Sequence, residues 1–424
     1  MDTTLKGLIT SFTKSIDLYN YILKNHHRRT AIAAYHIGTA YHLSASQLSD
    51  LVIAAALHDI GALTIGERDA LIHMDVENPH PHARLGYYML ESFEPFKNIS
   101  KIVYYHHWPY EQDQHYSTEI GPVPIQSYIL HLADRIEILI NPLEPILTQT
   151  ARIKDIITSY SGNLFHPGVV SAFLKVSVQD SFWLDIGNLS LDTVFETAIS
   201  DDLAIEVTPD LLEQFAFTLS KIIDSRSRFT ISHSFGVSAV AYQIAKYAGY
   251  SEEKCRLIRI AGLLHDMGKI AISPAIIEKP GSLTPGERSN VQTHAYYTYL
   301  ILKDIDALGE IRGWAANHHE NHLGSGYPRN LDERAISEEM DIVAYADIYT
   351  ALSEDRPYRK SLSSEEILAI MRKDYIDKHG QALFDIIESH ITEIDRVCKD
   401  SIRDGTNRYE IFEEFSEKEA LSMI

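Results

Sequence analysis

The feature that most constrains the fold is an internal repeat of histidine and aspartate positions. His58-Asp59 and His265-Asp266 lie 207 residues apart (265 minus 58), and His26 and His233 are separated by the same interval. Farther along, intervals of 212 or 213 residues relate His82 to His294, His106-His107 to His318-His319, and Asp134 to Asp347. Two short changes in length therefore bring every pair into register. Such a repeat predicts two tandem domains of the same fold.

The sequence of both halves of the repeat predicts helices. The chain has 424 residues, more than one domain normally holds. Apolar residues recur at helical spacing over 30–43, 48–57, 237–247 and 255–264, and no alternating run bounded by hairpin turns is found. Thr208-Pro209 predicts the start of a long helix that runs to about Ile223. We therefore expect an all-α fold, with a junction in the mixed polar and apolar segment 180–206.

Composition excludes several classes of function. A net charge of −21 is unfavourable for binding a nucleic-acid polymer. The two cysteines, Cys255 and Cys398, form no CxxC pair, so disulfide scaffolds and thiolate metal sites are not expected. The first 30 residues lack a secretory h-region, and no apolar run approaches membrane-spanning length. We expect a cytoplasmic protein that does not insert into a membrane.

The second half of the repeat predicts a metal centre. Its series of five histidines and two aspartates comprises His233, His265, Asp266, His294, His318, His319 and Asp347. Seven such ligands are too many for one ion but suit two, and imidazole with carboxylate favours iron, manganese or zinc. Two ions about 3.5–4 Å apart can polarise a phosphoryl oxygen and supply a nucleophilic hydroxide near neutral pH. The pattern therefore indicates phosphoester hydrolysis.

The adjacent pair His265-Asp266 ends an apolar helix and precedes Gly268 and Lys269. Neighbouring helix residues point about 100° apart, so the two side chains are unsuited to gripping one ion as an i, i+4 pair does. They suit a site in which the carboxylate bridges two ions and the histidine completes one shell. Lys269 would place an ammonium beside these ions. Taken alone, the pair also fits a structural hydrogen bond at a helix end.

These motifs resemble a known family. His265-Asp266-Met267-Gly268-Lys269, His318-His319-Glu320 and Gly324-Ser325-Gly326-Tyr327-Pro328 together are similar to the signature of the HD-GYP phosphodiesterases. Supporting stretches are found at 276–281 and 355–360, and the resemblance covers about 209–391. It implies an all-α, metal-containing domain that hydrolyses cyclic dinucleotides to linear ones.

The resemblance also implies roles for the ligands. One ion would be held by His233, His265 and Asp347, and the other by His294, His318 and His319, with Asp266 bridging the two. Lys269 would stabilise developing charge or assist proton transfer, which makes Lys269 and Asp266 the expected catalytic residues. Trinuclear members carry a glutamate where this chain has Phe229, so two divalent ions are expected, with iron or manganese favoured.

Substrate contacts are expected from a glycine-rich loop and a basic run. Gly324 and Gly326 would let the backbone approach a ligand, Tyr327 offers a ring and a hydroxyl, and Pro328 fixes the chain path. Guanidinium groups suit bidentate phosphate contacts, which singles out the run Arg356, Arg359 and Lys360. Three residues depart from the family pattern, since Leu323 and Ser227 each replace an aspartate and Thr298 replaces a glycine.

The first half of the repeat lacks part of this equipment. His26, His58, Asp59, His82, His106, His107 and Asp134 are in position, but Ala62 stands where Lys269 would be. Trp108-Pro109-Tyr110 follows His107, with no Gly-Tyr-Pro sequence. We therefore expect a degenerate HD-like domain over 1–200 and a catalytic HD-GYP domain over 208–424. The N-terminal series would form either a second, non-catalytic metal site or a set of buried hydrogen-bonding residues.

The resulting expectation is a metal-dependent cyclic-dinucleotide phosphodiesterase that releases a linear 5′-phosphorylated dinucleotide. The tandem layout is similar to the 3′3′-cyclic GMP-AMP phosphodiesterases, so 3′3′-cyclic GMP-AMP (cGAMP) is favoured over cyclic di-GMP. A catalytically silent cyclic-dinucleotide receptor or scaffold and an HD-type nucleotidase are the alternatives. The acidic, amphipathic stretch from Arg403 indicates a packing or dimer helix, so a homodimer is a further expectation.

Overall fold

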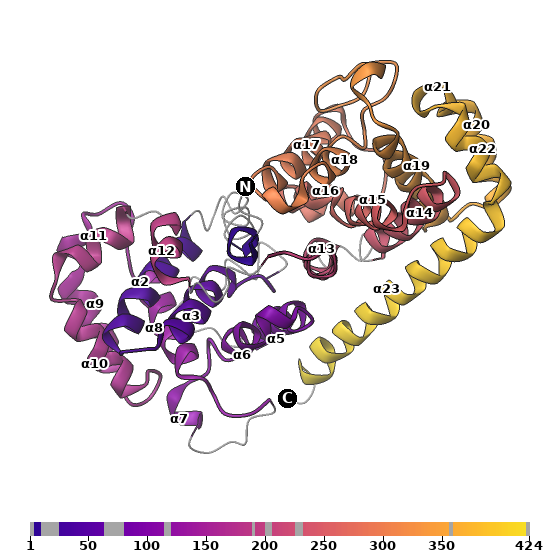
Figure 1. Cartoon of the computed structure of the whole chain (residues 1–424). Coiled ribbons are helices and arrows are strands. Elements are labelled where there is room, and N and C mark those ends of the chain that lie inside the picture. The colour runs from indigo at the N-terminus through magenta and orange to yellow at the C-terminus, as the bar shows by residue number, and fades with distance from the viewer. Residues whose placement is uncertain are drawn as a thin grey trace. The chain divides into compact units, whose positions relative to one another are not determined.

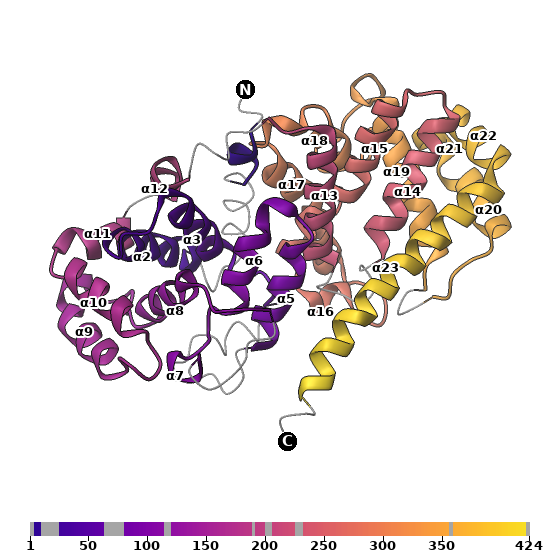
Figure 2. The ribbon, with the colours of Figure 1, turned by 60° about the horizontal axis from the view of Figure 1, so that its bottom comes forward.

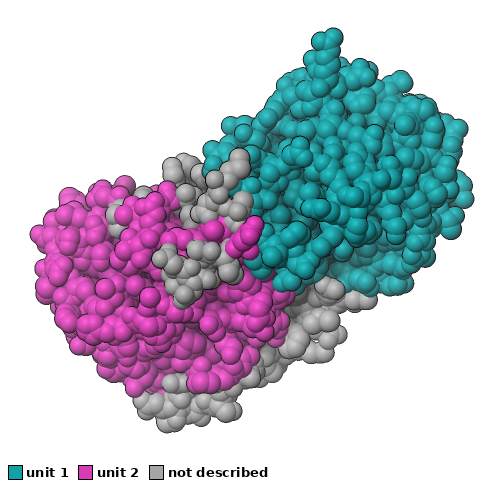
Figure 3. Space-filling model, viewed as in Figure 1, with its two compact units in different colours: residues 1, 207–424 teal, residues 2–206 magenta. Residues whose placement is uncertain are grey.

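The computed structural model describes residues 4–9, 25–62, 80–113, 120–188, 191–199, 206–224, 232–355 and 359–420. The chain divides into two compact units, residues 2–206 and residues 207–424 together with Met1 (Figure 3). Helices dominate both units, and the described residues outside them form only two isolated β-bridges, Thr4–Glu206 and Ser161–Phe165. The all-α prediction is confirmed.

The N-terminal unit is built around α2, which packs against α3 and α8, while α5 packs against α6 (Figure 1). Its helices are α2 (His26–Ala40), α3 (Ala45–Leu57), α5 (His80–Glu91), η1 (Glu94–Phe96), α6 (Lys97–Tyr104), α7 (Tyr110–Asp113), α8 (Ile125–Ile138), η2 (Ile146–Thr148), α9 (Thr150–Ser159), α10 (Pro167–Val176), α11 (Asp180–Asn188) and α12 (Leu191–Ala198). The three helices α10, α11 and α12 contact α2 as well.

The C-terminal unit repeats this arrangement around α14, which packs against α15 and α19; Figure 2 shows α23 alongside the same helix. Its helices are α13 (Pro209–Asp224), α14 (His233–Tyr247), α15 (Glu252–Leu264), η4 (Met267–Ala271), α16 (Pro274–Ile277), α17 (Pro285–Leu302), η5 (Asp306–Leu308), α18 (Ile311–Ala316), η6 (Glu333–Ala335), α19 (Glu338–Ser353), α20 (Ser364–Asp374), α21 (Ile376–His379), α22 (Gln381–Ser389) and α23 (Ile391–Ala420). In chain order, α2, α3, α5, α6 and α8 therefore correspond to α14, α15, α17, α18 and α19.

Matching caps begin the helices that lead to the two His-Asp pairs. The Ser44 hydroxyl accepts a hydrogen bond from the Gln47 amide at the start of α3, and Ser251 does the same for Lys254 at the start of α15. These caps satisfy amide groups that the first helical turn leaves without partners. Both helices are about three residues longer at their N-termini than the apolar spacing predicted, because that spacing only registers where the buried stripe begins.

The segment 180–206, expected as a junction, is helical over most of its length. Phe182, Trp183 and Ile186 of α11 and Phe195 of α12 are buried, so both helices belong to the core of the N-terminal unit. The division between the units falls after Glu206, at the end of this segment. Glycine and asparagine at 187–188 mark the end of α11 and not a linker. Within the part of the chain that the structure describes, no helix is both long and apolar enough to cross a membrane.

Candidate metal centre

The C-terminal unit brings all seven predicted ligands together from five helices. Three groups have ligand atoms within 4.8 Å of one another. Two are His233 with His265 and Asp347, and His294 with His318 and His319, and the third joins them through His265, Asp266 and His318. His233 opens α14, His265 follows α15, His294 lies in α17, the tandem histidines follow α18, and Asp347 lies in α19. The first two groups are the two ligand sets that the family resemblance implied.

Asp266 lies between the two sets, with one oxygen toward each. Its Oδ2 atom is 3.2 Å from Nε2 of His265 and 3.8 Å from Nε2 of His233. Its Oδ1 atom is 3.5 Å from Nε2 of His294, which belongs to the other set. Because α15 ends at Leu264, His265 and Asp266 lie at the turn that follows the helix, and the carboxylate faces both sets.

The histidines are oriented by backbone carbonyls in a way that fits metal ligation. Nδ1 of His265, His294 and His318 donates to the carbonyl oxygen three residues earlier, at 2.6–2.8 Å. A ring nitrogen that faces a carbonyl must carry the proton, so Nε2 of each ring keeps its lone pair. These three Nε2 atoms are buried and have no hydrogen-bond partner among the described residues. Divalent ions at this centre would satisfy them.

Protonation states at the centre also suit a metal pair. Burial opposes ionisation of Asp266, but the charges of His265 and Lys269 hold the pKa of its carboxyl well below the usual range. Burial and neighbouring histidines lower the pKa of His319 to about 3 and shift the pKa of His318 downward as well. Neutral imidazoles and ionised carboxylates are the forms that bind metal, so Asp266, His318 and His319 are in their metal-binding forms near neutral pH.

Lys269 lies directly beside the bridging carboxylate. Its ammonium nitrogen is 2.5 Å from Oδ2 of Asp266, one turn of the short helix η4 away. Gly268 permits this position, because a Cβ atom there would lie 1.9 Å from the carbonyl oxygen of His294. Thr298, which departs from the family pattern, accepts a hydrogen bond from the Gly268 amide and donates to the His265 carbonyl. The threonine hydroxyl therefore joins η4 to α17 without altering a ligand.

The Gly-Tyr-Pro loop is held against the second ligand set. The carboxylate of Glu320 accepts hydrogen bonds from the backbone amides of Arg329 and Leu331. These bonds hold the segment that follows Pro328 against the start of the loop. The Tyr327 ring lies 4.6 Å from that of His319, measured between centroids. Burial, together with the charges of Asp347 and Asp266, raises the pKa of Tyr327, so its hydroxyl is a hydrogen-bond donor at neutral pH.

The described residues of the basic run, Arg359 and Lys360, contact other groups of the protein. The Arg359 guanidinium donates to the backbone carbonyls of Ala351, Leu352 and Lys360, and it thereby caps the end of α19. Lys360 pairs with Asp355 at 2.9 Å on the exposed surface. A phosphate contact from Arg359 stays a prediction and would require these bonds to be exchanged. Arg356 and Phe229 lie outside the described residues.

Two buried glutamates were not identified from the sequence. One lies against the first histidine of each series. Glu354 accepts a hydrogen bond from Nδ1 of His233 at 3.0 Å, and Glu137 lies 2.5 Å from Nδ1 of His26. Each follows the last aspartate of its series. Glu137 lies three residues after Asp134 in the same helix, and Glu354 lies seven residues after Asp347, just past the end of α19. That spacing was the available signal, although glutamates at helical spacing are common on solvated faces as well.

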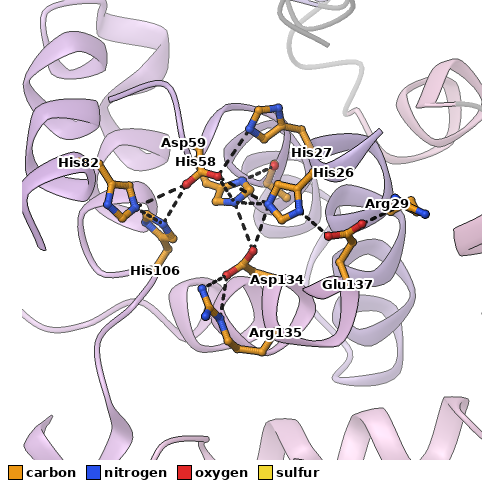
Figure 4. A network of polar contacts seen from close by, with 11 residues as sticks. His26, His27, Arg29, His58, Asp59, His82, His106, Asp134, Arg135 and Glu137 are labelled. Atoms are coloured by element: carbon orange, nitrogen blue, oxygen red, sulfur yellow. Dashed lines mark hydrogen bonds and ion pairs between the residues drawn. The ribbon is translucent and has the colours of Figure 1, made fainter. Parts of the chain in front are cut away.

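The N-terminal unit preserves the same geometry (Figure 4). Asp59 directs Oδ2 toward Nε2 of His58 at 3.3 Å and Oδ1 toward Nε2 of His82 at 3.5 Å. His106 lies with His82 on the Oδ1 side, while Asp134 is 3.2 Å from Nε2 of His26 on the other side. All seven predicted residues of this half therefore gather at one place, and Asp59, His82, His106 and His107 form a four-membered candidate metal group.

Comparison with known proteins matches both halves of the repeat. A family model described as the HD domain matches residues 23–139, and a second model of the same description matches residues 218–381. The two tandem HD-type domains expected from the sequence are thereby confirmed.

Curated relatives and a solved structure extend this match. The chain is 28% identical over 374 residues to the 3′3′-cGAMP-specific phosphodiesterase 1 of Vibrio cholerae, covering 86% of each protein. It is 38% identical over 160 residues to a cyclic di-GMP phosphodiesterase response regulator of Xanthomonas campestris, covering 36% of this chain and 41% of that protein. The crystal structure of a cyclic GMP-AMP specific phosphodiesterase of V. cholerae has the same fold, with a TM-score of 0.61 and 22% identity, over 92% of this chain and 98% of that one.

Proposed function

Because the chain belongs to the HD-domain proteins, with two such domains in tandem, we propose that it is a metal-dependent phosphodiesterase that opens a cyclic dinucleotide. The observation that carries this proposal is the position of Asp266. Its two oxygens face two complete ligand sets, and the Lys269 ammonium lies against it. The relative that matches most of the chain is named as a phosphodiesterase of cyclic GMP-AMP, and one that matches part of it as a phosphodiesterase of cyclic di-GMP.

The residues present fit a pair of divalent ions, with iron or manganese favoured by the mixed imidazole and carboxylate ligands. His233, His265 and Asp347 would hold one ion, His294, His318 and His319 the other, and Asp266 both. When bound, such a pair supplies an activated water and polarises the phosphoryl group of a substrate. The overall reaction adds one water, breaks one phosphorus–O3′ bond and leaves a 3′-hydroxyl and a 5′-phosphate.

The chain's own residues would position the substrate and stabilise charge. The ammonium of Lys269 lies where negative charge develops on the phosphoryl oxygens, so it would stabilise the transition state or move a proton. The Tyr327 hydroxyl, protonated at neutral pH, would donate a hydrogen bond to the ligand, and the close path of Gly326 and Pro328 would shape the site edge. Arg356 and Arg359 are proposed as phosphate contacts by analogy with the basic run of the family.

We propose 3′3′-cGAMP as the preferred substrate and cyclic di-GMP as the second. The support is the relative that matches the chain over 86% of its length, which is named for cGAMP. Leu323 is 61% exposed at the start of the Gly-Tyr-Pro loop, where it offers an apolar surface to a base and no carboxylate acceptor for a guanine amine. The ratio of kcat/KM for the two substrates measures this preference.

The test is incubation of the purified full chain with Mn²⁺ or Fe²⁺ and each cyclic dinucleotide, followed by chromatographic separation of the products. The proposal predicts a linear 5′-phosphorylated dinucleotide, formed faster from cGAMP than from cyclic di-GMP. Binding of a cyclic dinucleotide without any linear product would identify a silent receptor. Hydrolysis of mononucleotides alone would identify a nucleotidase.

Two further proposals concern the surroundings of the enzyme. A cyclic dinucleotide is a small molecule found in the cytoplasm, and we propose that the chain works there on this small molecule and not on a nucleic-acid polymer. We also propose a homodimer, with α23 as the contact, because this acidic, amphipathic helix extends over 30 residues. Sedimentation of the full chain measures its oligomeric state.

A further inference from the structure

The N-terminal unit contains a histidine beside its bridging carboxylate that has no equivalent in the C-terminal series. His27 directly follows His26, whereas Ser234 follows His233. The His27 side chain is buried, and its Nε2 atom lies 3.8 Å from Oδ2 of Asp59. In Figure 4 its ring stands over Asp59 on the side away from Asp134.

The oxygen that His27 faces is the one that Lys269 faces in the other unit. In the C-terminal unit, Oδ2 of Asp266 lies toward His265 and also contacts the Lys269 ammonium at 2.5 Å. In the N-terminal unit, Oδ2 of Asp59 lies toward His58 and also toward His27. Ala62 stands where the lysine would be, and a ring nitrogen from α2 lies toward the same carboxylate oxygen, at 3.8 Å.

His27 is placed as a neighbour of the ligand set and not as a member of it. Among the described residues, the group with ligand atoms within 4.8 Å of one another on this side is His26, His58 and Asp59. The rings of His26, His27 and His58 are 5.2–5.4 Å apart between centroids, so His27 completes a triangle around the carboxylate. Lys269, which as an ammonium cannot ligate a metal, holds the corresponding outer position in the C-terminal unit.

The charge of the N-terminal centre favours an anion. The seven residues of its ligand set supply five imidazoles and the two carboxylates of Asp59 and Asp134, so two divalent ions leave an excess of positive charge. Arg135 adds a guanidinium that donates to Oδ2 of Asp134 at 2.7 Å. The ligands are more enclosed than in the C-terminal unit, since the Asp134 side chain is 2% exposed and Asp347 is 16% exposed. A small oxyanion therefore fits this centre better than a dinucleotide.

We propose that the N-terminal unit holds its own pair of divalent ions and binds phosphate or a phosphate-sized oxyanion, with His27 as the hydrogen-bond donor that takes the place of Lys269. His27 is then a positioning residue for the anion. This inference is independent of the substrate proposed for the C-terminal unit, because it concerns a different ligand set and requires no turnover.

Metal content tests the first part. The full chain, its variants and an exposed-histidine control, His42→Asn, are loaded with Mn²⁺, desalted and analysed for manganese per chain. We expect about four ions in the wild type and about two in either Asp59→Ala or Asp266→Ala, since each change removes the bridge of one pair. His27→Ala and His42→Asn keep the wild-type number. Equal metal content in the wild type and Asp59→Ala, or a loss of only about two ions in His27→Ala, would overturn the proposal.

Phosphate binding tests the second part, in an Asp266→Ala background that leaves only the N-terminal centre intact. Calorimetric titration with inorganic phosphate should show one saturable site that is lost in Asp59→Ala/Asp266→Ala. Adding His27→Ala should weaken this binding about tenfold, the effect of removing one hydrogen bond to a charged group. His27→Lys should restore it, because the ammonium regains the role seen in Lys269.

Two results of the titration would contradict the assignment. One is phosphate binding that is equally tight with and without His27. The other is a His27→Lys variant that keeps its metal but binds phosphate no better than His27→Ala. Manganese content is measured on every sample, so a variant that fails to fold is recognised by the loss of all its metal, and His27→Gln then serves as the smaller change.

Discussion

At the scale of single residues, the chemistry of the C-terminal centre depends on the ammonium of Lys269. It contacts the bridging Asp266 but lies outside the ligand sets. We predict that Lys269→Gln lowers kcat by about 10²–10³, the usual effect of removing a donor that stabilises transition-state charge, with metal content unchanged. Steady-state hydrolysis of the cyclic dinucleotide measures this, with the exposed Lys246→Gln as the matched control. A kcat within twofold of the wild type would remove Lys269 from the mechanism.

Gly326 is needed because no side chain fits at its position. A Cβ atom at this position would lie 2.4 Å from Cα of Glu320 and 2.5 Å from the His319 carbonyl, so the Gly-Tyr-Pro loop must move away. We predict that Gly326→Ala raises KM several-fold, because the loop that holds Tyr327 is displaced. Gly286→Ala is the control, since no atom lies within 4 Å of its Cβ position. An unchanged KM in Gly326→Ala would show that the loop does not contact the substrate.

At the scale of elements, α19 contributes a ligand and also the group that orients another ligand. Asp347 lies within the helix, and Glu354 at its end accepts the hydrogen bond from Nδ1 of His233. A carboxylate in this position raises the basicity of the imidazole and fixes its ring. We predict that Glu354→Gln lowers the metal affinity of the C-terminal centre at least about tenfold. A competitive metal-chelator titration measures the affinity, and Glu365→Gln on the surface should leave it unchanged.

The helices also show how much of the fold could be predicted from the sequence. Apolar spacing located four of the helices around the ligands, α2, α3, α14 and α15, because burial of one helix face leaves a periodic pattern. The same method mistook α11 and α12 for a junction, because their polar residues at 187–188 resemble a linker when packing against α2 is not visible. Glu354, Glu137 and His27 were missed for a related reason. Their roles depend on contacts between helices distant in the chain.

At the scale of the whole molecule, the repeat itself was the most informative sequence feature. It predicted two tandem all-α domains and the convergence of seven ligands in each, since a duplicated order of histidines and aspartates requires a duplicated fold. What it could not supply was the orientation of side chains around each bridging aspartate. For that reason the loss of the lysine at Ala62 indicated only a domain without catalysis, while the structure shows His27 facing the corresponding carboxylate oxygen.

Both units should lose stability together in acid when metal is removed. Burial and neighbouring charges lower the pKa of His319 and of His82 to about 3, against about 6.5 in an unfolded chain. Between these values the unfolded state binds more protons, so the stabilisation is complete above about pH 6.5 and is lost as the pH falls toward 3. The charge of Glu137 raises the pKa of His26 despite burial. This one histidine therefore stabilises the folded chain more in acid, opposite to the effect of His319 and His82.

We therefore predict that the Tm of the chelator-treated chain is lower at about pH 5 than at about pH 7.5. Thermal unfolding followed by circular dichroism measures the difference. A Tm that is equal at both pH values, or higher at about pH 5, would mean that the buried histidines do not control the stability of the metal-free chain.

The most direct test of the account compares the two bridging aspartates in one assay of cyclic-dinucleotide hydrolysis. Asp266→Ala should abolish formation of the linear product, because it removes the carboxylate shared by both ligand sets of the catalytic centre. Asp59→Ala should retain turnover, since it alters only the N-terminal centre. Activity that survives in Asp266→Ala and disappears in Asp59→Ala would show that the catalytic site had been assigned to the wrong unit.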